Sequence, residues 1–136
     1  MKASEQGEEL EPVRVTPDRY LPYRYAGAAE DFNPIHVDAE FARSVGLPGN
    51  ILHGLYGMGI LARALVEQVG EGDPRRLRSL RLQFRGMGFP EREIEITGSV
   101  REGDEEELVV AAEATQGDSP LIREAEARLS RQTPGA

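Results

Sequence analysis

The sequence predicts an α+β domain in which an antiparallel sheet wraps around one long central helix. Over residues 54–69 the apolar side chains recur at spacings of three and four, which is typical of a helix with one buried face. From residue 79 onward the spacing switches to two, which is typical of strands with one buried face. A sheet and a helix that each have one apolar face bury those faces against each other, so we expect two layers around one core.

Length and composition limit what the chain can be. Its 136 residues fit a single domain with a continuous core. The net charge of −8 argues against a nucleic-acid or anionic-membrane surface. The absence of cysteine excludes a disulfide frame and a thiolate nucleophile, and it fits a reducing cytoplasm. No apolar run approaches the ~20 residues that span a bilayer, and residues 1–11 are acidic where a signal peptide is basic and then apolar. We therefore expect a cytoplasmic protein.

The folded domain is expected over residues 13–131. Residues 1–12 are rich in glutamate and poor in apolar side chains, which predicts a flexible acidic tail. Residues 132–136 are expected to form a flexible C-terminus. Residues 14–25 mix aromatic and β-branched side chains with proline. This mixture predicts a short edge strand followed by a helix of about two turns over residues 22–29.

A stiff turn and a short helix come next. Pro34 lacks a backbone N–H, and Asn33, as the residue before proline, is pushed towards extended geometry. Residues 31–36 are therefore predicted to form a turn and not a helix. Asp38 can cap the first N–H groups of a helix over residues 39–45, which the following glycine and proline end.

The long helix and four strands complete the predicted fold. Residues 70–74, Gly-Glu-Gly-Asp-Pro, break the long helix. The strands that follow are predicted over residues 79–85, 93–100, 108–115 and 121–129, with turn residues at 103–104 and 117–120 between the later ones. Strands joined in this way form an antiparallel sheet, whose exposed edge or free face can pair with a second copy.

One six-residue segment carries the acid and base groups of interest, Asp31-Phe32-Asn33-Pro34-Ile35-His36. A helix would splay two side chains five positions apart, because helix neighbours are three or four apart. A turn can instead direct Asp31 and His36 into one pocket, where a carboxylate and an imidazole form an acid/base pair. The alternative is that Asp31 caps a turn and His36 is a hydrogen-bonded, partly buried imidazole. Spacing alone leaves both interpretations open.

The wider sequence around this pair resembles the MaoC-like hydratases and dehydratases. The resemblance lies in residues 25–38, Tyr-Ala-Gly-Ala-Ala-Glu-Asp-Phe-Asn-Pro-Ile-His-Val-Asp, followed by Phe41-Ala42 and by Leu52-His53-Gly54-Leu55. It is strong over residues 25–59, and the order of the later strands agrees with it. Members of this family have the hot-dog fold, so the resemblance implies a single hot-dog domain. Many members have Ser-Gly before the aspartate, where this chain has Ala29-Glu30.

The resemblance implies a hydro-lyase that needs no cofactor. It identifies Asp31 and His36 as the catalytic pair and the backbone N–H of Gly54 as the oxyanion donor. The implied reaction is the reversible hydration of trans-2-enoyl thioesters of coenzyme A or acyl carrier protein to (R)-3-hydroxyacyl thioesters. This chemistry requires a water activated towards the β-carbon, a proton for the α-carbon and stabilisation of the enolate oxygen. Gly54 is expected to begin the long helix, where an N–H is free and the helix dipole is positive.

Further residues are candidates for binding the substrate. Arg75 and Arg76 belong to the dense basic cluster of residues 75–81. This cluster could contact the phosphates of coenzyme A or an acidic carrier protein, or it could be a solvated strand end. Tyr56 and Phe84 are expected at the acyl pocket, although both positions also fit the core.

The role of His53 and the prospect of a metal site are linked. His53 either fixes the entry to the long helix or lines the pocket, and we favour the structural role. A metal site built from Asp31, His36, Asp38 and His53 is disfavoured, because these residues lie on separate elements. No metal is therefore expected.

Two other functions are compatible with the implied fold. A hot-dog thioesterase usually has a carboxylate early on the long helix, and residues 54–60 contain none, so thioester hydrolysis is disfavoured. Some hot-dog dehydratases pair an active chain with a non-catalytic chain that shapes the acyl pocket. The non-catalytic chain typically lacks the Asp or the His, whereas this chain has both. We therefore expect either a homodimer or the catalytic half of a heterodimer with a related hot-dog chain.

Overall fold

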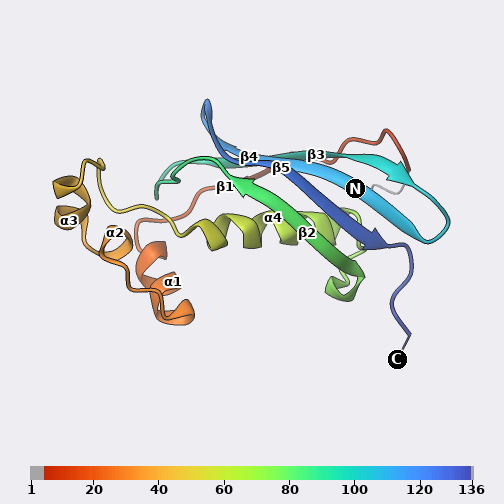
Figure 1. Ribbon diagram of the computed structural model, residues 1–136, viewed down its shortest axis with the longest axis horizontal. Helices are drawn as coiled ribbons and strands as arrows, with labels where there is room; N and C mark the ends of the chain where they lie inside the picture. The colour runs from red at the N-terminus through yellow and green to blue at the C-terminus, as the bar shows by residue number, and fades with distance from the viewer. Residues whose placement is uncertain (1–4, 136) are drawn as a thin grey trace.

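The computed structural model describes residues 5–135 and has two layers, a five-stranded antiparallel sheet and the helix α4 (Gly54–Gln68) that runs along one of its faces (Figure 1). The strand order is β1-β3-β4-β5-β2, so β1 and β2 form the edges. The strands are β1 (Val13–Val15), β2 (Leu77–Phe84), β3 (Ile94–Gly103), β4 (Glu107–Gln116) and β5 (Ser119–Ser130). The prediction of an antiparallel sheet around one long helix is confirmed.

The core lies between α4 and the sheet. Leu61 and Leu65 of α4 are fully buried, as are Val110 of β4 and Leu129 of β5. The opposite face of the sheet carries ion pairs between neighbouring strands, such as the 3.3 Å contact of Arg81 with Glu126. Burial of apolar groups therefore fixes α4 against one face, and any cavity for an apolar ligand belongs on that side.

Residues 5–12 differ from the predicted flexible tail, because they run along β3. The N–H of Leu10 donates to the carbonyl of Gly98 at 2.9 Å, the N–H of Gly7 donates to that of Val100 at 2.9 Å, and the Leu10 side chain is buried. The low apolar content of residues 1–12 suggested a flexible tail, but backbone hydrogen bonds and one buried leucine hold residues 5–12 on the sheet. Residues 1–4 of the predicted tail and residue 136 lie outside the described residues.

Three short helices form a lobe at the N-terminal end of α4 (Figure 1). They are α1 (Leu21–Ala29), α2 (Pro34–Val37) and α3 (Ala39–Ser44). The predicted helices over residues 22–29 and 39–45 are confirmed to within a residue. The Asp38 side chain caps α3 by accepting from the N–H of Phe41 at 3.0 Å, as expected.

The prediction that residues 31–36 contain no helix is wrong for its second half. Pro34 is the first residue of the single-turn helix α2, and the Asn33 side chain accepts from the N–H of Ile35 at 3.2 Å. Proline is well tolerated at this position because the first N–H of a helix has no intrahelical partner. Asp31 stays outside α2, so the helix does not splay it from His36.

Among residues 5–135, no helix is both long and apolar enough to cross a bilayer.

Candidate active site

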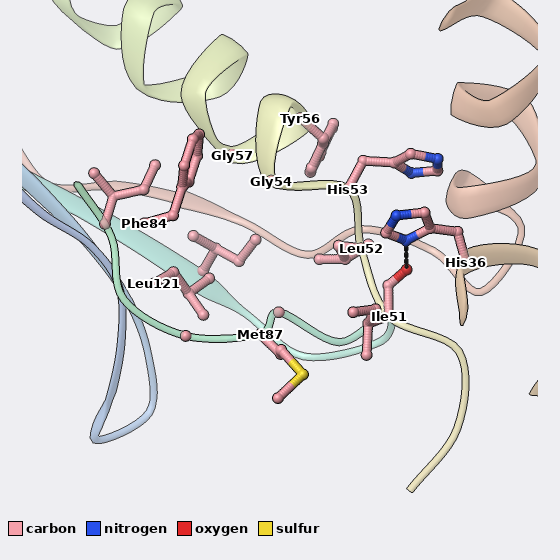
Figure 2. Close-up of a pocket in the computed structure, with 14 residues that line it drawn as sticks. His36, Ile51, Leu52, His53, Gly54, Tyr56, Gly57, Phe84, Met87 and Leu121 are labelled. Carbon is pink, nitrogen blue, oxygen red and sulfur yellow. Dashed lines mark hydrogen bonds between the residues drawn. The ribbon is translucent and has the colours of Figure 1, made fainter. Parts of the chain in front are cut away.

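The imidazole of His36 has a fixed orientation. It projects from α2, is buried, and has Nδ1 2.9 Å from the carbonyl oxygen of Ile51 (Figure 2). A carbonyl only accepts hydrogen bonds, so Nδ1 carries the proton in neutral His36 and Nε2 keeps the lone pair. Two more hydrogen bonds connect residues 35–36 with residues 50–51. The Asn50 amide donates to the His36 carbonyl at 3.0 Å, and the N–H of Ile51 donates to the Ile35 carbonyl at 2.9 Å.

Asp31 faces the free nitrogen of His36. Its carboxylate oxygen lies 4.0 Å from Nε2, and its side chain is half exposed. This separation exceeds a direct hydrogen bond, so each group keeps a lone pair for a third molecule such as water. Asp31 follows Glu30, whose left-handed backbone (φ 57°, ψ 30°) ends α1 and turns the chain. The turn therefore brings the two side chains to facing positions, and their shared role in catalysis stays a prediction.

An apolar cavity of about 190 Å³ lies next to His36, between the start of α4 and the sheet (Figure 2). Of the predicted site residues, His36, Gly54, Tyr56 and Phe84 line it. Asp31 is not among the lining residues and meets the site through its contact with His36. The cavity therefore has one end with a polar imidazole and walls that suit a hydrocarbon chain.

Gly54 is the first residue of α4, as predicted. No side chain caps this helix end, and the Gly54 N–H, as the first of the helix, has no acceptor within it, whereas the Tyr56 N–H donates to the His53 carbonyl at 3.1 Å. The ring of Phe84 approaches so closely that a Cβ on residue 54 would lie 3.3 Å from it. Glycine thus allows close packing at the cavity wall, where the N–H adds partial positive charge.

The ring of Tyr56 lines the cavity, and its hydroxyl is the one polar group of this side chain. Burial first, and the negative charge of Asp18 second, raise the pKa of the Tyr56 hydroxyl, while Arg24 acts in the opposite direction. The hydroxyl is therefore neutral at physiological pH. Tyr56 can therefore shape the cavity and donate a hydrogen bond.

His53 has features of both roles considered for it. As the residue before α4 it fixes the helix entry, and its buried ring also lines the cavity. The His53 ring stacks on that of His36 with centroids 3.8 Å apart, and the centroid of the Tyr25 ring lies 4.6 Å from that of His53. Its Nε2 lies 3.0 Å from the Asp31 carbonyl oxygen and donates to it. Local sequence patterns give no signal for a stack between residues 17 positions apart.

A loop that sequence reasoning missed closes the cavity. This pocket loop, residues 85–93, brings Met87 and its neighbours to the cavity wall. The buried side chain of Gln116 accepts from the Phe89 N–H at 2.8 Å and donates to the carbonyls of Phe89 and Arg92 at 2.8 and 3.0 Å. All hydrogen-bonding groups of this amide are directed at the loop, so Gln116 holds it in place. The only signal in the sequence was a polar residue at the end of a strand.

Arg75 and Arg76 do not join the cavity within one chain. They lie in the short 3₁₀ helix η1 (Pro74–Arg76), beyond the C-terminal end of α4. The 15 residues of α4 separate this end from Gly54 by about 22 Å. Each arginine has an acidic partner, Asp73 at 3.0 Å and Glu71 at 3.2 Å respectively. Arg75 is exposed, as the alternative of a solvated strand end requires, whereas the Arg76 side chain is largely buried and its Nε has no hydrogen-bond partner among the described residues.

The three side chains Asp31, His36 and His53 each offer a ligand atom within 4.8 Å of the others. Asp38 is not in this group, because it caps α3. The two imidazole planes are only 19° apart in a stack, and each ring already uses one nitrogen on a backbone carbonyl. A metal must lie in the plane of every imidazole that binds it, and no point near both free nitrogens satisfies two stacked planes. This geometry fits a hydrogen-bonded water better than a metal.

Comparison with known proteins places this geometry in context. The family model described as MaoC like domain matches residues 2–118. Enoyl-CoA hydratase 2, peroxisomal, of Arabidopsis thaliana is 39% identical over 77 residues, which cover 57% of this chain and 24% of that protein. The fatty acid synthase beta subunit hexB of Dothistroma septosporum is 32% identical over 111 residues, which cover 79% of this chain and 6% of that protein. The chain thus spans a quarter or less of these two relatives.

Solved structures agree on the fold. The (R)-hydratase from A. caviae superposes with a TM-score of 0.81 at 19% identity, over 95% of this chain and 98% of that one. A chain of the ChsH1-ChsH2 complex from Mycobacterium tuberculosis gives 0.82 at 18% identity, over 94% and 98%. A protein described as a MaoC-like dehydratase gives 0.86 at 26% identity, over 94% of this chain and 42% of that one. The predicted hot-dog fold is confirmed, and the chain belongs to the MaoC-like domain family.

Proposed function

We propose that this protein reversibly hydrates trans-2-enoyl thioesters to (R)-3-hydroxyacyl thioesters. The observation that carries the proposal is the free Nε2 of His36, held 4.0 Å from the Asp31 carboxylate at the end of an apolar cavity. The Gly54 N–H at the start of α4 lies on the wall of the same cavity. A base, an acid and an electrophile at one apolar site are what the hydration requires.

In the proposed reaction, one water adds across the double bond. A water between Asp31 and His36 loses a proton to one of the two groups as its oxygen bonds to the β-carbon. The electrons of the double bond move to the thioester, where the Gly54 N–H stabilises the enolate oxygen. The α-carbon then takes a proton from the pair, so the site ends with the protons it began with. Dehydration follows the same path in reverse.

The class of substrate follows from the cavity and the relatives. The cavity walls are apolar, which suits an acyl chain, and the thioester must lie near Gly54. Relatives are named as enoyl-CoA hydratases and as fatty acid synthase subunits, so both coenzyme A and carrier-protein thioesters are candidate substrates. The R configuration and the cytoplasmic location remain predictions. One relative has "peroxisomal" in its name.

The first test uses crotonyl-CoA and follows the loss of its ultraviolet absorbance with the purified chain. Asp31→Asn and His36→Ala should each remove most turnover, because each loses one half of the proton transfer. Asp38→Asn makes the same chemical change seven residues away, and asparagine caps a helix as well as aspartate, so this control should retain wild-type activity. Wild-type turnover in Asp31→Asn or His36→Ala would refute the proposal.

A second candidate is the catalytic half of a heterodimeric dehydratase. The fold match to a chain of the ChsH1-ChsH2 complex supports considering it, and Asp31 and His36 would make this chain the active half. Light scattering of the purified chain, combined with the crotonyl-CoA assay, separates the candidates. An active homodimer favours the first, and an inactive chain that gains activity with a related partner favours the second. Release of free thiol would indicate thioester hydrolysis instead.

A further inference from the structure

We propose that His53 is a positioning residue for this hydration, and that its imidazole holds Asp31, His36 and the start of α4 in one fixed arrangement. The effect on turnover rests on the proposed function, whereas the effect on His36 is a property of the free protein. Nothing in the proposed proton transfers uses His53, and it is buried at the centre of the site.

His53 contacts Asp31 and His36 and directly precedes Gly54; Figure 2 shows the His53 and His36 rings side by side. Its ring lies against His36, with centroids 3.8 Å apart and planes 19° apart. Its Nε2–H donates to the backbone carbonyl of Asp31 at 3.0 Å. Along the chain it directly precedes Gly54, so the same residue sets where the first N–H of α4 lies. His53 thereby links the backbone of Asp31, the ring of His36 and, through the chain, the proposed oxyanion donor Gly54.

Packing alone does not explain a histidine at this position. Because Nε2 carries the proton, Nδ1 of neutral His53 is an acceptor, and it is buried without a hydrogen-bond partner among the described residues. A buried polar atom without a partner lowers stability. A phenylalanine would fill the space between Tyr25 and His36 without such an atom. The retained imidazole is therefore better explained by its contact with Asp31 than by stability.

The stack restricts His36 in the one way that its own hydrogen bond does not. The bond from Nδ1 to the Ile51 carbonyl fixes one edge of the His36 ring but allows tilting about that bond. The face of His53 removes this freedom and keeps Nε2 directed at Asp31.

Three variants separate the two contacts. His53→Phe keeps the stack and loses the donor to Asp31, His53→Gln keeps a donor and loses the stack, and His53→Leu loses both. Small displacements of reacting groups reduce rates by up to about 100-fold. We expect kcat to fall about tenfold in the Phe and Gln variants and about 100-fold in the Leu variant, with KM changing less than about threefold. The melting temperature of His53→Phe should equal or exceed that of the wild type.

Val69→Ala is the control for stability, because Val69 is buried at the far end of α4. It should lower the melting temperature and leave kcat unchanged. The second readout is the ¹⁵N shift of the His36 ring in the free protein, which reports the tautomer with Nδ1 protonated. Without the stack the His36 ring can tilt, which weakens its Nδ1 bond to the Ile51 carbonyl, so His53→Leu should shift His36 towards a mixture of tautomers.

The proposal is overturned if kcat per folded molecule in His53→Leu stays within twofold of the wild type, or if the His36 tautomer is unchanged in that variant. A wild-type protein that is inactive on enoyl thioesters would refute the proposed function instead. In that case the ¹⁵N measurement still decides whether His53 positions His36.

Discussion

The residue before Asp31 offers a test of the backbone geometry that builds the site. Glu30 ends α1 with φ 57° and ψ 30°, in the left-handed region, while its N–H donates to the Ala26 carbonyl. A residue with a side chain is destabilised there by roughly 1–2 kcal/mol, whereas glycine is not. Glycine is the residue that many members of the family have at this position, and the left-handed φ gives a physical reason for it.

The expected effect of Glu30→Gly is the difference of two terms. Relief of the left-handed backbone stabilises by roughly 1–2 kcal/mol, and the added freedom of glycine in the unfolded chain opposes this by roughly 0.5–1 kcal/mol. The net gain lies between about 0 and 1.5 kcal/mol, and its midpoint of roughly 0.75 kcal/mol corresponds to a rise of roughly 2–4 °C in melting temperature for a domain of this size. The Glu30 side chain is exposed, so its removal leaves no cavity.

The matched control is Ala28→Gly, two residues earlier on the exposed surface of α1. Here the backbone is helical, so glycine should destabilise by roughly 0.5–1 kcal/mol. Thermal and urea unfolding followed by circular dichroism would give both values. Opposite signs for two glycine substitutions on one helix would establish the left-handed strain. Equal losses in the two variants would show that the reasoning from φ is wrong.

The remaining predictions concern the cavity, the pocket loop and the loss of stability at low pH. Gly54→Ala keeps the N–H but places a Cβ 3.3 Å from the Phe84 ring, so kcat/KM for crotonyl-CoA should fall about tenfold. The double variant with Phe84→Leu should recover this loss, and a lack of recovery would argue against the contact. Gln116→Leu leaves polar groups of the pocket loop without partners, so the free energy of unfolding in urea should fall by about 2–3 kcal/mol and the loop should become sensitive to proteolysis. Unchanged protection from proteolysis would show that Gln116 does not hold the loop. The hydrogen bond from Arg75, and next that from the Thr133 hydroxyl, hold the pKa of Asp73 well below its usual value. The stability from this lowered pKa is therefore present above pH ~4 and lost on acidification below it, so Asp73→Asn should flatten the fall in melting temperature between about pH 4 and 2.

Local patterns predicted the elements better than the contacts between them. The spacing of apolar residues located α4 and the strands, because each element buries one face and that face has a period. The same reasoning missed the docking of residues 5–12, since the carbonyl of Gly98 that accepts from Leu10 lies 88 positions away. It also left Arg75 open between a phosphate contact and a solvated strand end, because the sequence does not show that Asp73, two residues earlier, pairs with that side chain. Charge clusters in sequence do not reveal which charges are already paired.

In the candidate site, too, local features were predictable from the sequence and long-range contacts were not. Residues 31–36 could be singled out because their chemistry is local, with a carboxylate and an imidazole on one constrained segment. Their partners could not, because Ile51, His53 and Gln116 act through hydrogen bonds that span 15, 22 and up to 27 positions. All three partners act through or upon backbone carbonyls, which every residue possesses. Such contacts leave little trace in residue type.

This use of backbone carbonyls also accounts for how the site is fixed. His36, on the first segment, donates to the carbonyl of Ile51 on the second, and His53, on the second, donates to the carbonyl of Asp31 on the first. The two bonds cross-link residues 31–36 and 51–53 in both directions, and the ring stack closes the space between them. Each imidazole is left with one free nitrogen, and only that of His36 lies opposite the Asp31 carboxylate. The two histidines therefore have similar backbone anchors but different chemical positions, which is why we assign proton transfer to one and positioning to the other.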